Sequence, residues 1–314
     1  MRTSLSQQIQ SSLAFTGSAS QRLLDAQDHA VSGKRIMRPS DDVPGTNRAL
    51  TLRSSINTVD QFTNNITVSK PLVDATESAM SDMVKAINQV RIITVAAANE
   101  DYSGSADTSY IAQLNEIMKQ MVDIANTKHG DQFVFSGTAT STMPVVLNPG
   151  PVPDPAVQPY TYAGNQGTKT TQVLSWISLP VNIPGDKYFN FDTGAGNPAG
   201  AGTTDLFTMV RQVRDAIQSK NRTSVSSQLT NIDANLSNAL ASQAQIGSWM
   251  SRMEGAKGNL EDTKNRLKTM LSYTEDSDLT QAIVDLKSQE NVYQTALSIT
   301  SRMLDLSLAS LQLK

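Results

Sequence analysis

Apolar residues alternate at spacings of four and three along two long stretches of the chain. The later stretch runs from Val225 to Leu271, interrupted by polar residues at Gln243, Lys257 and Lys264. The earlier stretch runs from Leu52 to Ile87. This spacing is typical of helices that pack along a seam, so the two stretches predict two long helices that pair as a coiled coil.

Four residues disturb these helical patterns. Pro71 lies inside the earlier stretch and predicts a kink or a break, because proline lacks an N–H and crowds the preceding turn. Gly247, Gly255 and Gly258 lie in the later stretch, and each costs about 1 kcal/mol relative to alanine in a helix interior.

Both chain ends carry an apolar stripe. Asp278 with Gln281 three positions later fits a capping box, which predicts that the last helix begins there. An amphipathic helix buries its apolar stripe, so both stripes need something to cover them. The residues of these stripes that we take as a candidate assembly interface are Leu5, Ile9, Leu13, Tyr293, Leu297, Leu304 and Leu311.

A different kind of sequence occupies the middle of the chain. Most of the prolines lie between Pro144 and Pro198, and the PGPVPDP run at 149–155 cannot be helical. Strand-like runs follow at 170–183 (TTQVLSWISLPVNI) and 187–191 (KYFNF), which predict a small β-rich insert.

The expected fold is therefore mainly α: long antiparallel helices form a coiled-coil rod with paired N- and C-terminal flanks, and a small β-rich domain is inserted centrally. A terminal helix lies at each end of the chain, and the two halves of the rod flank the insert. In chain order the predicted segments are 1–40, 41–130, 131–203 (the insert), 204–277 and 278–314.

Composition excludes several classes of protein. The 314 residues include no cysteine, and their formal net charge is −3 with lysine and arginine scattered along the chain. We therefore expect no disulfide framework and no nucleic-acid partner. The N-terminus has no apolar signal-peptide core and no run is apolar enough to span a bilayer, so we expect neither a cleaved signal peptide nor a membrane segment.

Catalytic chemistry has little support. The two histidines, His29 and His129, are too few for a metal site or a convincing triad, and no GxSxG motif occurs. The glycines at 33 and in GAGNPAG (194–200) have the spacing of ordinary loops rather than of nucleotide-binding turns. The acids at 41–42 and at 275–278 are expected to cap helices. We predict no catalytic, cofactor or metal site, and no enzyme.

Several motifs carry a resemblance to a known family. SGKRIMRPSDD (32–42) and LTLRSSINTVDQFTNNI (50–66) resemble the N-terminal signature of the flagellin superfamily. The segment 83–104 is similar to the second helix of flagellins, and 259–297 resembles the family's C-terminal pattern. The resemblance covers both flanks of the chain, and it implies a structural subunit of the bacterial flagellum.

Within that superfamily, other motifs are closer to the branch that forms the junction between hook and filament. They are MRTS (1–4), GKRIxRPSDD, FVFSGT (133–138), a V-N-x-P-G-D-x-x-F turn (181–189) and the closing SRMLDLSLASLQLK (301–314). The resemblance implies that the termini form an antiparallel coiled coil in an inner tube. Leu297, Leu304 and Leu311 would then meet Leu5, Ile9 and Leu13 before packing on neighbouring subunits. We expect these ends to become ordered only on assembly, since isolated helices are marginal in water.

The resemblance also implies partners and a location. The partners would be the hook-associated protein of the preceding ring, flagellin, further copies of the chain and a flagellar export chaperone. The protein would be exported unfolded by the flagellar type III route and act outside the cell. Two alternatives remain: filament flagellin, and an adhesin or binding module that uses the aromatic residues of the insert. Those aromatics are Tyr160, Tyr162, Trp176, Tyr188 and Phe189.

Overall fold

The computed structural model describes residues 2–99, 105–147, 160–191 and 204–312, with side chains described from residue 7 to residue 305 within these ranges. The PGPVPDP and GAGNPAG segments lie outside the described residues. The chain forms two compact units. The first unit combines Met1–Val59 with Asp262–Lys314, and the second unit is Asp60–Glu261.

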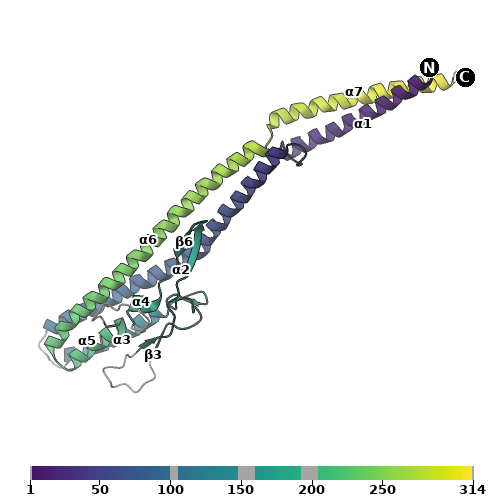
Figure 1. The fold of residues 1–314 in the computed structure, drawn as a ribbon. Coiled ribbons are helices and arrows are strands. Elements are labelled where there is room, and N and C mark those ends of the chain that lie inside the picture. Colours follow the sequence, from purple (N-terminus) through teal and green to yellow (C-terminus); the bar gives the residue numbers. More distant parts are fainter. Residues whose placement is uncertain (1, 100–104, 148–159, 192–203, 313–314) are drawn as a thin grey trace. The chain divides into compact units, whose positions relative to one another are not determined.

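Long helices dominate both units, as the sequence pattern predicted (Figure 1). The mainly α fold with a small central β-rich insert is confirmed. The four long helices are α1 (Arg2–Ser32), α2 (Val43–Asn99), α6 (Arg222–Glu275) and α7 (Leu279–Gln312). Helices α1 and α7 belong to the first unit, whereas α2 and α6 contribute residues to both.

Of the kink or break predicted at Pro71, the break does not occur, because α2 continues through this residue. A proline at this position leaves the carbonyl of Thr67 without its usual N–H partner. Both Pro71 and Thr67 are exposed, so water can bind that carbonyl and the helix tolerates the loss. The glycines at 247, 255 and 258 likewise leave α6 unbroken.

The described part of the second unit also holds three shorter helices and six short strands. Helices α3 (Ser105–Ala125) and α5 (Leu206–Gln218) pack side by side. The strands pair into three antiparallel two-stranded sheets. These sheets are β1 (Lys128–His129) with β2 (Gln132–Phe133), β3 (Val145–Leu147) with β4 (Tyr160–Tyr162), and β5 (Thr170–Leu174) with β6 (Ile177–Pro180).

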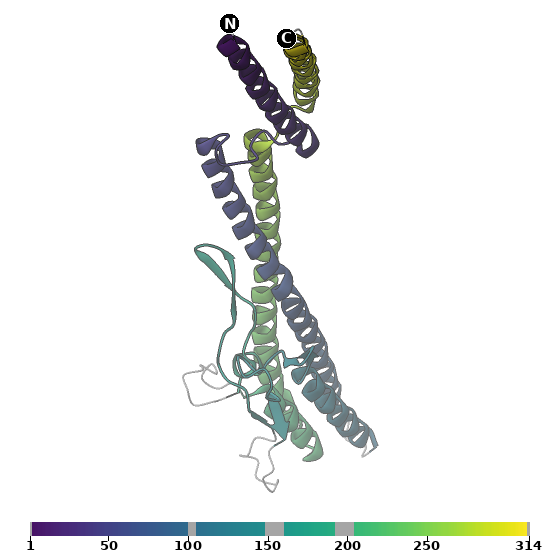
Figure 2. The same ribbon diagram turned by 90° about the vertical axis from the view of Figure 1, so that its right-hand side faces the viewer.

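The β5–β6 hairpin confirms the predicted strands at 170–183, and it lies against α2 (Figure 2). The side-chain amide of Asn65 donates a hydrogen bond to the carbonyl of Gln172 at 3.1 Å. The KYFNF run, however, is not a strand: its first three residues end the short helix α4 (Gly185–Phe189). This helix stops because Asn190 adopts a left-handed conformation at φ 62°, which asparagine tolerates better than most residues.

Aromatic rings form the core of the second unit. Phe189 is fully buried, and its ring centroid lies 5.1 Å from those of both Phe135 and Tyr188 and 5.7 Å from that of Phe207. The Tyr188 hydroxyl donates to the carbonyl of Met80 at 3.2 Å, which ties the cluster to α2. Burial raises the pKa of Tyr188 well above its ordinary value. By contrast, Trp176 at the tip of the β5–β6 hairpin is 81% exposed.

Candidate assembly surface of the paired chain ends

Helices α1 and α7 of the first unit lie side by side and run antiparallel (Figure 1). The Thr16 and Thr300 hydroxyls are 2.9 Å apart, and the Ser12 hydroxyl donates to the sulfur of Met303 at 3.0 Å. The residue number increases from Ser12 to Thr16 along α1, while that of the partner decreases from Met303 to Thr300 along α7. The two helices are therefore antiparallel. Asp278 caps α7 by accepting hydrogen bonds from the backbone N–H groups of Thr280 and Gln281, so the predicted helix start is confirmed.

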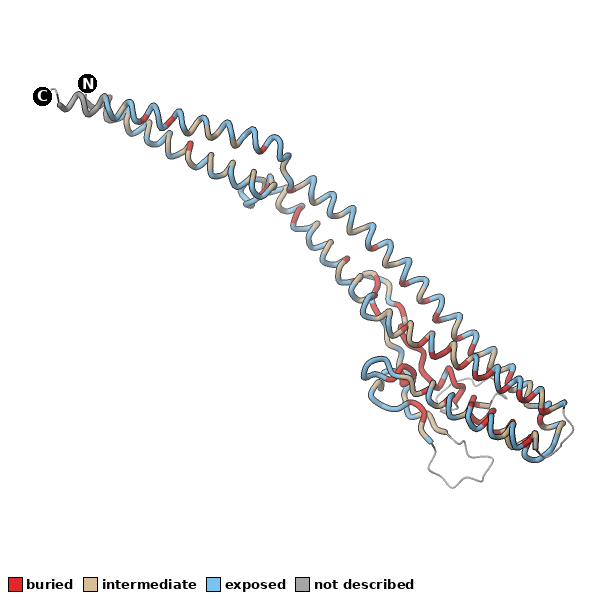
Figure 3. Tube along the Cα trace, turned by 180° about the vertical axis from the view of Figure 1, so that it is seen from behind, coloured by how far each residue is buried: buried red, intermediate tan, exposed pale blue. Residues whose placement is uncertain are grey.

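Small residues form the seam between these two helices. Ala19, Ala296 and Thr300 are buried, with exposed fractions of 1%, 2% and 7%. Burying an alanine methyl contributes roughly 0.8 kcal/mol, against about 1.5–3 kcal/mol for a leucine side chain. The pair is therefore held together by little apolar area. Figure 3 shows that few residues along α1 and α7 are buried.

The predicted interface leucines lie beside this seam rather than in it. Leu13, Leu297 and Leu304 are 52%, 44% and 40% exposed, so none of the three is buried in the seam, and their expected contact across the pair stays a prediction. Each follows a seam residue by one position, and a helix turns about 100° per residue, which points the leucine out of the seam. Ile9 and Tyr293 are half-buried. Leu5 and Leu311 lie on α1 and α7, but their side chains are outside the described part of the chain.

Sequence reasoning missed two apolar residues on the other side of the pair. Phe15 and Ile299 are 51% and 47% exposed. They line two adjoining hollows between α1 and α7, of about 390 Å³ and 290 Å³, whose other walls are mainly serine, threonine and alanine. The signal in the sequence was weak, since each residue stands one position before a polar threonine and outside the repeating stripe.

A third hollow of about 370 Å³ lies nearer the ends of α1 and α7 that adjoin the connecting loops. Arg22, Asp25 and Asp285 contribute charged groups to its lining. His29 also lines it, and its Nδ1 donates a hydrogen bond to the carbonyl of Lys34 at 2.8 Å. This contact holds the loop that follows α1, which ends where Gly33 takes a left-handed φ of 65°.

A buried carboxylate, that of Glu275, connects the α1–α2 loop to the end of α6. We call this cluster of Glu275 with Lys34, Arg35, Ile36 and Arg53 the joint. Glu275, the last residue of α6, is 4% exposed and lies 2.7 Å from Arg53 and 3.5 Å from Lys34. Its backbone carbonyl accepts hydrogen bonds from the N–H groups of Arg35 and Ile36. Glu275 was expected to cap a helix. Instead it connects the α1–α2 loop to the end of α6 through both its side chain and its backbone.

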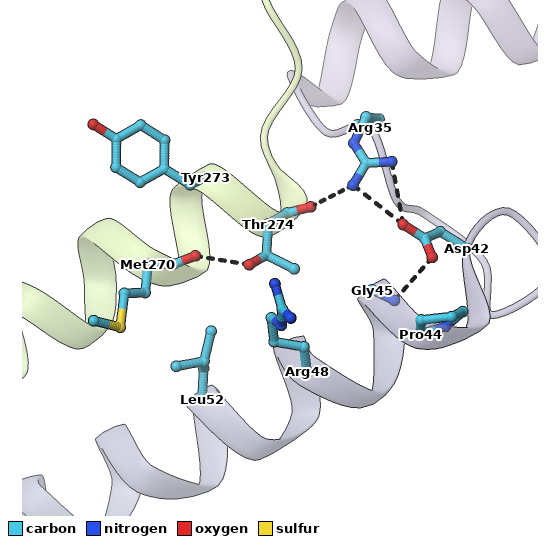
Figure 4. Close-up of a pocket in the computed structure, with 9 residues that line it drawn as sticks. All are labelled: Arg35, Asp42, Pro44, Gly45, Arg48, Leu52, Met270, Tyr273 and Thr274. Atoms are coloured by element: carbon cyan, nitrogen blue, oxygen red, sulfur yellow. Dashed lines mark hydrogen bonds and ion pairs between the residues drawn. The ribbon is translucent and has the colours of Figure 1, made fainter.

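An open pocket of about 640 Å³ lies next to this joint (Figure 4). Arg35 spans one edge, donating to Asp42 at 3.3 Å and to the carbonyl of Thr274 at 2.9 Å. Leu52 and Met270 line the pocket, together with Arg48 from α2. The lining contains no histidine and only one carboxylate, so it offers neither a metal-ligand set nor a nucleophile with its base.

Asp42 caps helix α2, as expected, whereas Asp41 binds N–H groups of the preceding loop instead of a helix end. Asp42 accepts a hydrogen bond from the N–H of Gly45 at 2.9 Å at the start of α2, and this bond lowers the pKa of its carboxyl. The N–H groups of Arg38 and Met37 do the same for the pKa of Asp41. Within the described ranges no group of three metal-binding side chains converges. None of the described helices is long and apolar enough to cross a membrane.

Comparisons with known proteins cover both flanks of the chain. Residues 4–140 match the family model for the bacterial flagellin N-terminal helical region, and residues 220–312 match that for the bacterial flagellin C-terminal helical region. Helix α7, nearly all of α1 and the joint lie within these matches.

Individual relatives agree with these matches. The flagellar hook-associated protein 3 of Escherichia coli (strain K12) is 25% identical over 294 residues, covering 89% of this chain and 90% of that protein. A flagellin of Listeria innocua serovar 6a is 24% identical over 281 residues, covering 89% and 88%. The crystal structure of the flagellar junction protein FlgL from Legionella pneumophila has a TM-score of 0.58 at 16% identity, covering 74% of this chain and 100% of that one.

Proposed function

Because this chain belongs to the bacterial flagellin family, we propose that it is a structural subunit of the flagellum that forms the junction between hook and filament. It assembles with its neighbours through α1 and α7. The observation that carries this function is the similarity to hook-associated protein 3 along nearly the full length of both chains. The outward-facing leucines of α1 and α7 support assembly as the role of these helices.

The candidate interface consists of Leu5, Ile9, Leu13, Tyr293, Leu297, Leu304 and Leu311. In a free monomer Leu13, Leu297 and Leu304 expose much of their apolar surface to water. A neighbouring subunit that covered these side chains would contribute roughly 1.5–3 kcal/mol for each one fully buried. Assembly would therefore supply the apolar burial that the seam of small residues lacks.

The proposed partners follow from this position in the flagellum. They are the hook-associated protein of the preceding ring, flagellin, further copies of this chain, and an export chaperone that holds the C-terminal helix. The subunit would leave the cell by the flagellar type III route, and its role would be structural. The joint and the open pocket offer only structural contacts among their lining residues, which agrees with a building block.

Filament flagellin is the second candidate, favoured by the similarity to the Listeria flagellin at nearly equal identity. Deletion of the gene distinguishes the two. A junction subunit predicts cells with hooks but no filaments and with flagellin released into the medium, restored by the wild-type gene. Filaments that persist on the hooks of the deletion strain would refute the junction role.

The adhesin alternative receives less support from the insert. Of the five aromatic residues considered for a ligand groove, Tyr188 and Phe189 are buried in the aromatic cluster. Tyr162 donates a hydrogen bond to the carbonyl of Phe135 at 2.8 Å. These side chains are therefore occupied within the unit and do not line an open groove.

A further inference from the structure

We propose that the second unit contains a built-in bending point, at the level where Pro71 of α2 lies beside a glycine-bearing stretch of α6. This glycine stretch is 247–258, with glycines at 247, 255 and 258. Both helices continue through this level, so the bend deforms them without breaking them. The bending point goes beyond the proposed function, because it concerns how one subunit deforms rather than what it contacts.

Side-chain contacts between α2 and α6 place the proline and the glycines at one level. Lys70 Nζ lies 3.6 Å from the Oε1 atom of Glu254. Seven positions further along α2, the carboxylate of Glu77 accepts a hydrogen bond from the side-chain amide of Gln243 at 3.2 Å. The residue number rises along α2 while that of the partner falls along α6, so the helices are antiparallel. Pro71 therefore lies opposite the glycine stretch.

The packing of the monomer does not require glycine at any of the three positions. Gly247, Gly255 and Gly258 have a helical backbone, and a methyl group at each would meet no atom within 4 Å. Helix α6 contains no other glycine along its 54 residues. Glycine weakens a helix because its backbone has more conformational freedom than that of any other residue. The glycine stretch is therefore the part of α6 that deforms most easily.

The outer face of α6 also offers little resistance to bending at this level. Ile246, Met253 and Leu260 are buried and mark the inner face. A helix that bends toward one face brings the side chains of that face closer together. The middle of the face opposite the buried residues carries only small, exposed residues, which are Ala244, Gly247, Ser248, Ser251, Gly255 and Gly258. Helix α6 can thus bend with this outer face concave.

Pro71 favours a bend in the same direction. It lies two positions before the fully buried Val73, about 200° around the helix, so it faces solvent on the outer side of α2. Its ring crowds the carbonyl of Thr67, and that carbonyl has lost its N–H partner. Both effects open α2 on its outer side and make this side convex. Two neighbouring helices that bend together have one convex and one concave outer face, so the proline and the glycines act together.

Distances between paired spin labels on the full chain test the bending point. The chain contains no cysteine, so nitroxide labels attach only at cysteines that are introduced. Ala244→Cys with Asp262→Cys places two labels on the outer face of α6, on either side of the glycine stretch. Ser226→Cys with Ala244→Cys is the matched control, on the same face but with no glycine between the labels. Both pairs are separated by 18 positions, about 27 Å at 1.5 Å per residue.

The two pairs should give different distance distributions in double electron–electron resonance. A label on the helix surface lies about 6 Å from the axis, so a bend of about 20° shortens the distance on the concave face by roughly 2 Å. The distribution of the 244/262 pair should therefore extend roughly 2 Å further toward short distances than that of the 226/244 pair.

Alanine substitutions should remove this difference. Replacing Gly247, Gly255 and Gly258 together by alanine should narrow the 244/262 distribution to the width of the control pair, and Pro71→Ala should narrow it in part. Gly17→Ala should leave it unchanged, because this glycine also has open space around it but lies in α1. All these variants raise helix propensity, so the chain should still fold, which circular dichroism verifies.

Two results would overturn the bending point. One is an equal width for the two label pairs in the otherwise unchanged chain. The other is a broad 244/262 distribution that the three alanines leave unaltered. The junction function would survive both results, because the deletion phenotype tests it separately.

Discussion

The aromatic cluster of the second unit and the α1–α7 pair of the first unit bury very different side chains. The cluster packs Phe135, Phe189 and Phe207 with almost no exposure. The pair buries alanine and threonine in its seam and leaves Leu13, Leu297 and Leu304 substantially exposed. A region of the first kind is held by its own packing, whereas one of the second kind leaves apolar surface that other chains would cover in the proposed function. On that proposal the two regions divide folding and assembly between them.

The strongest way to test this contrast is to truncate one large side chain in each region. Phe189→Ala should destabilise the monomer by about 3–5 kcal/mol, because it removes a ring from a fully packed site. Leu297→Ala should change monomer stability by no more than about 0.5 kcal/mol, because this leucine is substantially exposed. Urea unfolding followed by circular dichroism measures both. Equal losses for the two variants would remove the basis of the comparison.

The joint at the base of the pair should show an intermediate effect. Glu275→Gln weakens the contacts to Arg53 and Lys34, and we expect a loss of about 1–2 kcal/mol because both cations are roughly half exposed. Hydrogen exchange at the amides of Arg35 and Ile36, which donate to the Glu275 carbonyl, should accelerate about tenfold. Glu261→Gln, which changes an exposed carboxylate, is the control and should leave these rates unchanged. Unaltered exchange in Glu275→Gln would mean that the carboxylate does not hold the joint.

A stabilising change should be available on α6. Gly255→Ala should add about 0.5–1 kcal/mol, since a methyl group there meets open space and the backbone is helical. Gly33→Ala should act in the opposite direction, because Gly33 has a left-handed φ of 65° that alanine adopts at a cost. Thermal unfolding of both variants is the measurement. A lower melting temperature for Gly255→Ala would indicate a role for that glycine beyond the monomer's helix.

The smallest effect is expected at the start of α2. The Gly45 N–H lowers the pKa of Asp42 from its model-peptide value of 3.8, so this carboxylate stabilises the folded state above that pH. The contribution is lost as the pH falls through the lower folded value. Asp42→Ala should therefore slightly lower the melting temperature at neutral pH, and the difference should vanish in strong acid. A difference that persists in strong acid would assign the effect to something other than the charged cap.

A coiled-coil seam consists of two rows of buried residues, and the sequence predicted one of these rows correctly in α6. In α6, residues spaced by seven from Val225 to Leu260 are buried at 225, 232, 239, 246, 253 and 260. The second row is displaced by one residue: Asn235, Ser242 and Trp249 are buried, each one position before a member of the predicted 4,3 pattern, which ran through Leu236 and Met250 and was interrupted at Gln243. In α7, Ala296 took the place expected for Leu297. Small residues allow close approach of two helices, and hydrophobic periodicity alone does not register that preference.

Contacts between residues that lie far apart in the chain could not be predicted from the sequence. Glu275 and Lys34 are 241 positions apart, and an acid at a helix end is more often a cap than a buried ion-pair partner. Phe15 and Ile299 were missed for a related reason, since only the antiparallel pairing brings them to the same hollows. The β-rich insert was predicted as a whole, but the left-handed Asn190 converted one of its expected strands into a helical turn.

Amide hydrogen exchange, measured in the free monomer and in assembled flagella, tests most directly whether neighbours complete the terminal pair. The account predicts rapid exchange at residues 7–30 and 285–305 of the monomer, slow exchange at residues 225–260, and strong protection of all three stretches after assembly. Terminal helices that are already as protected in the monomer as residues 225–260 would contradict it.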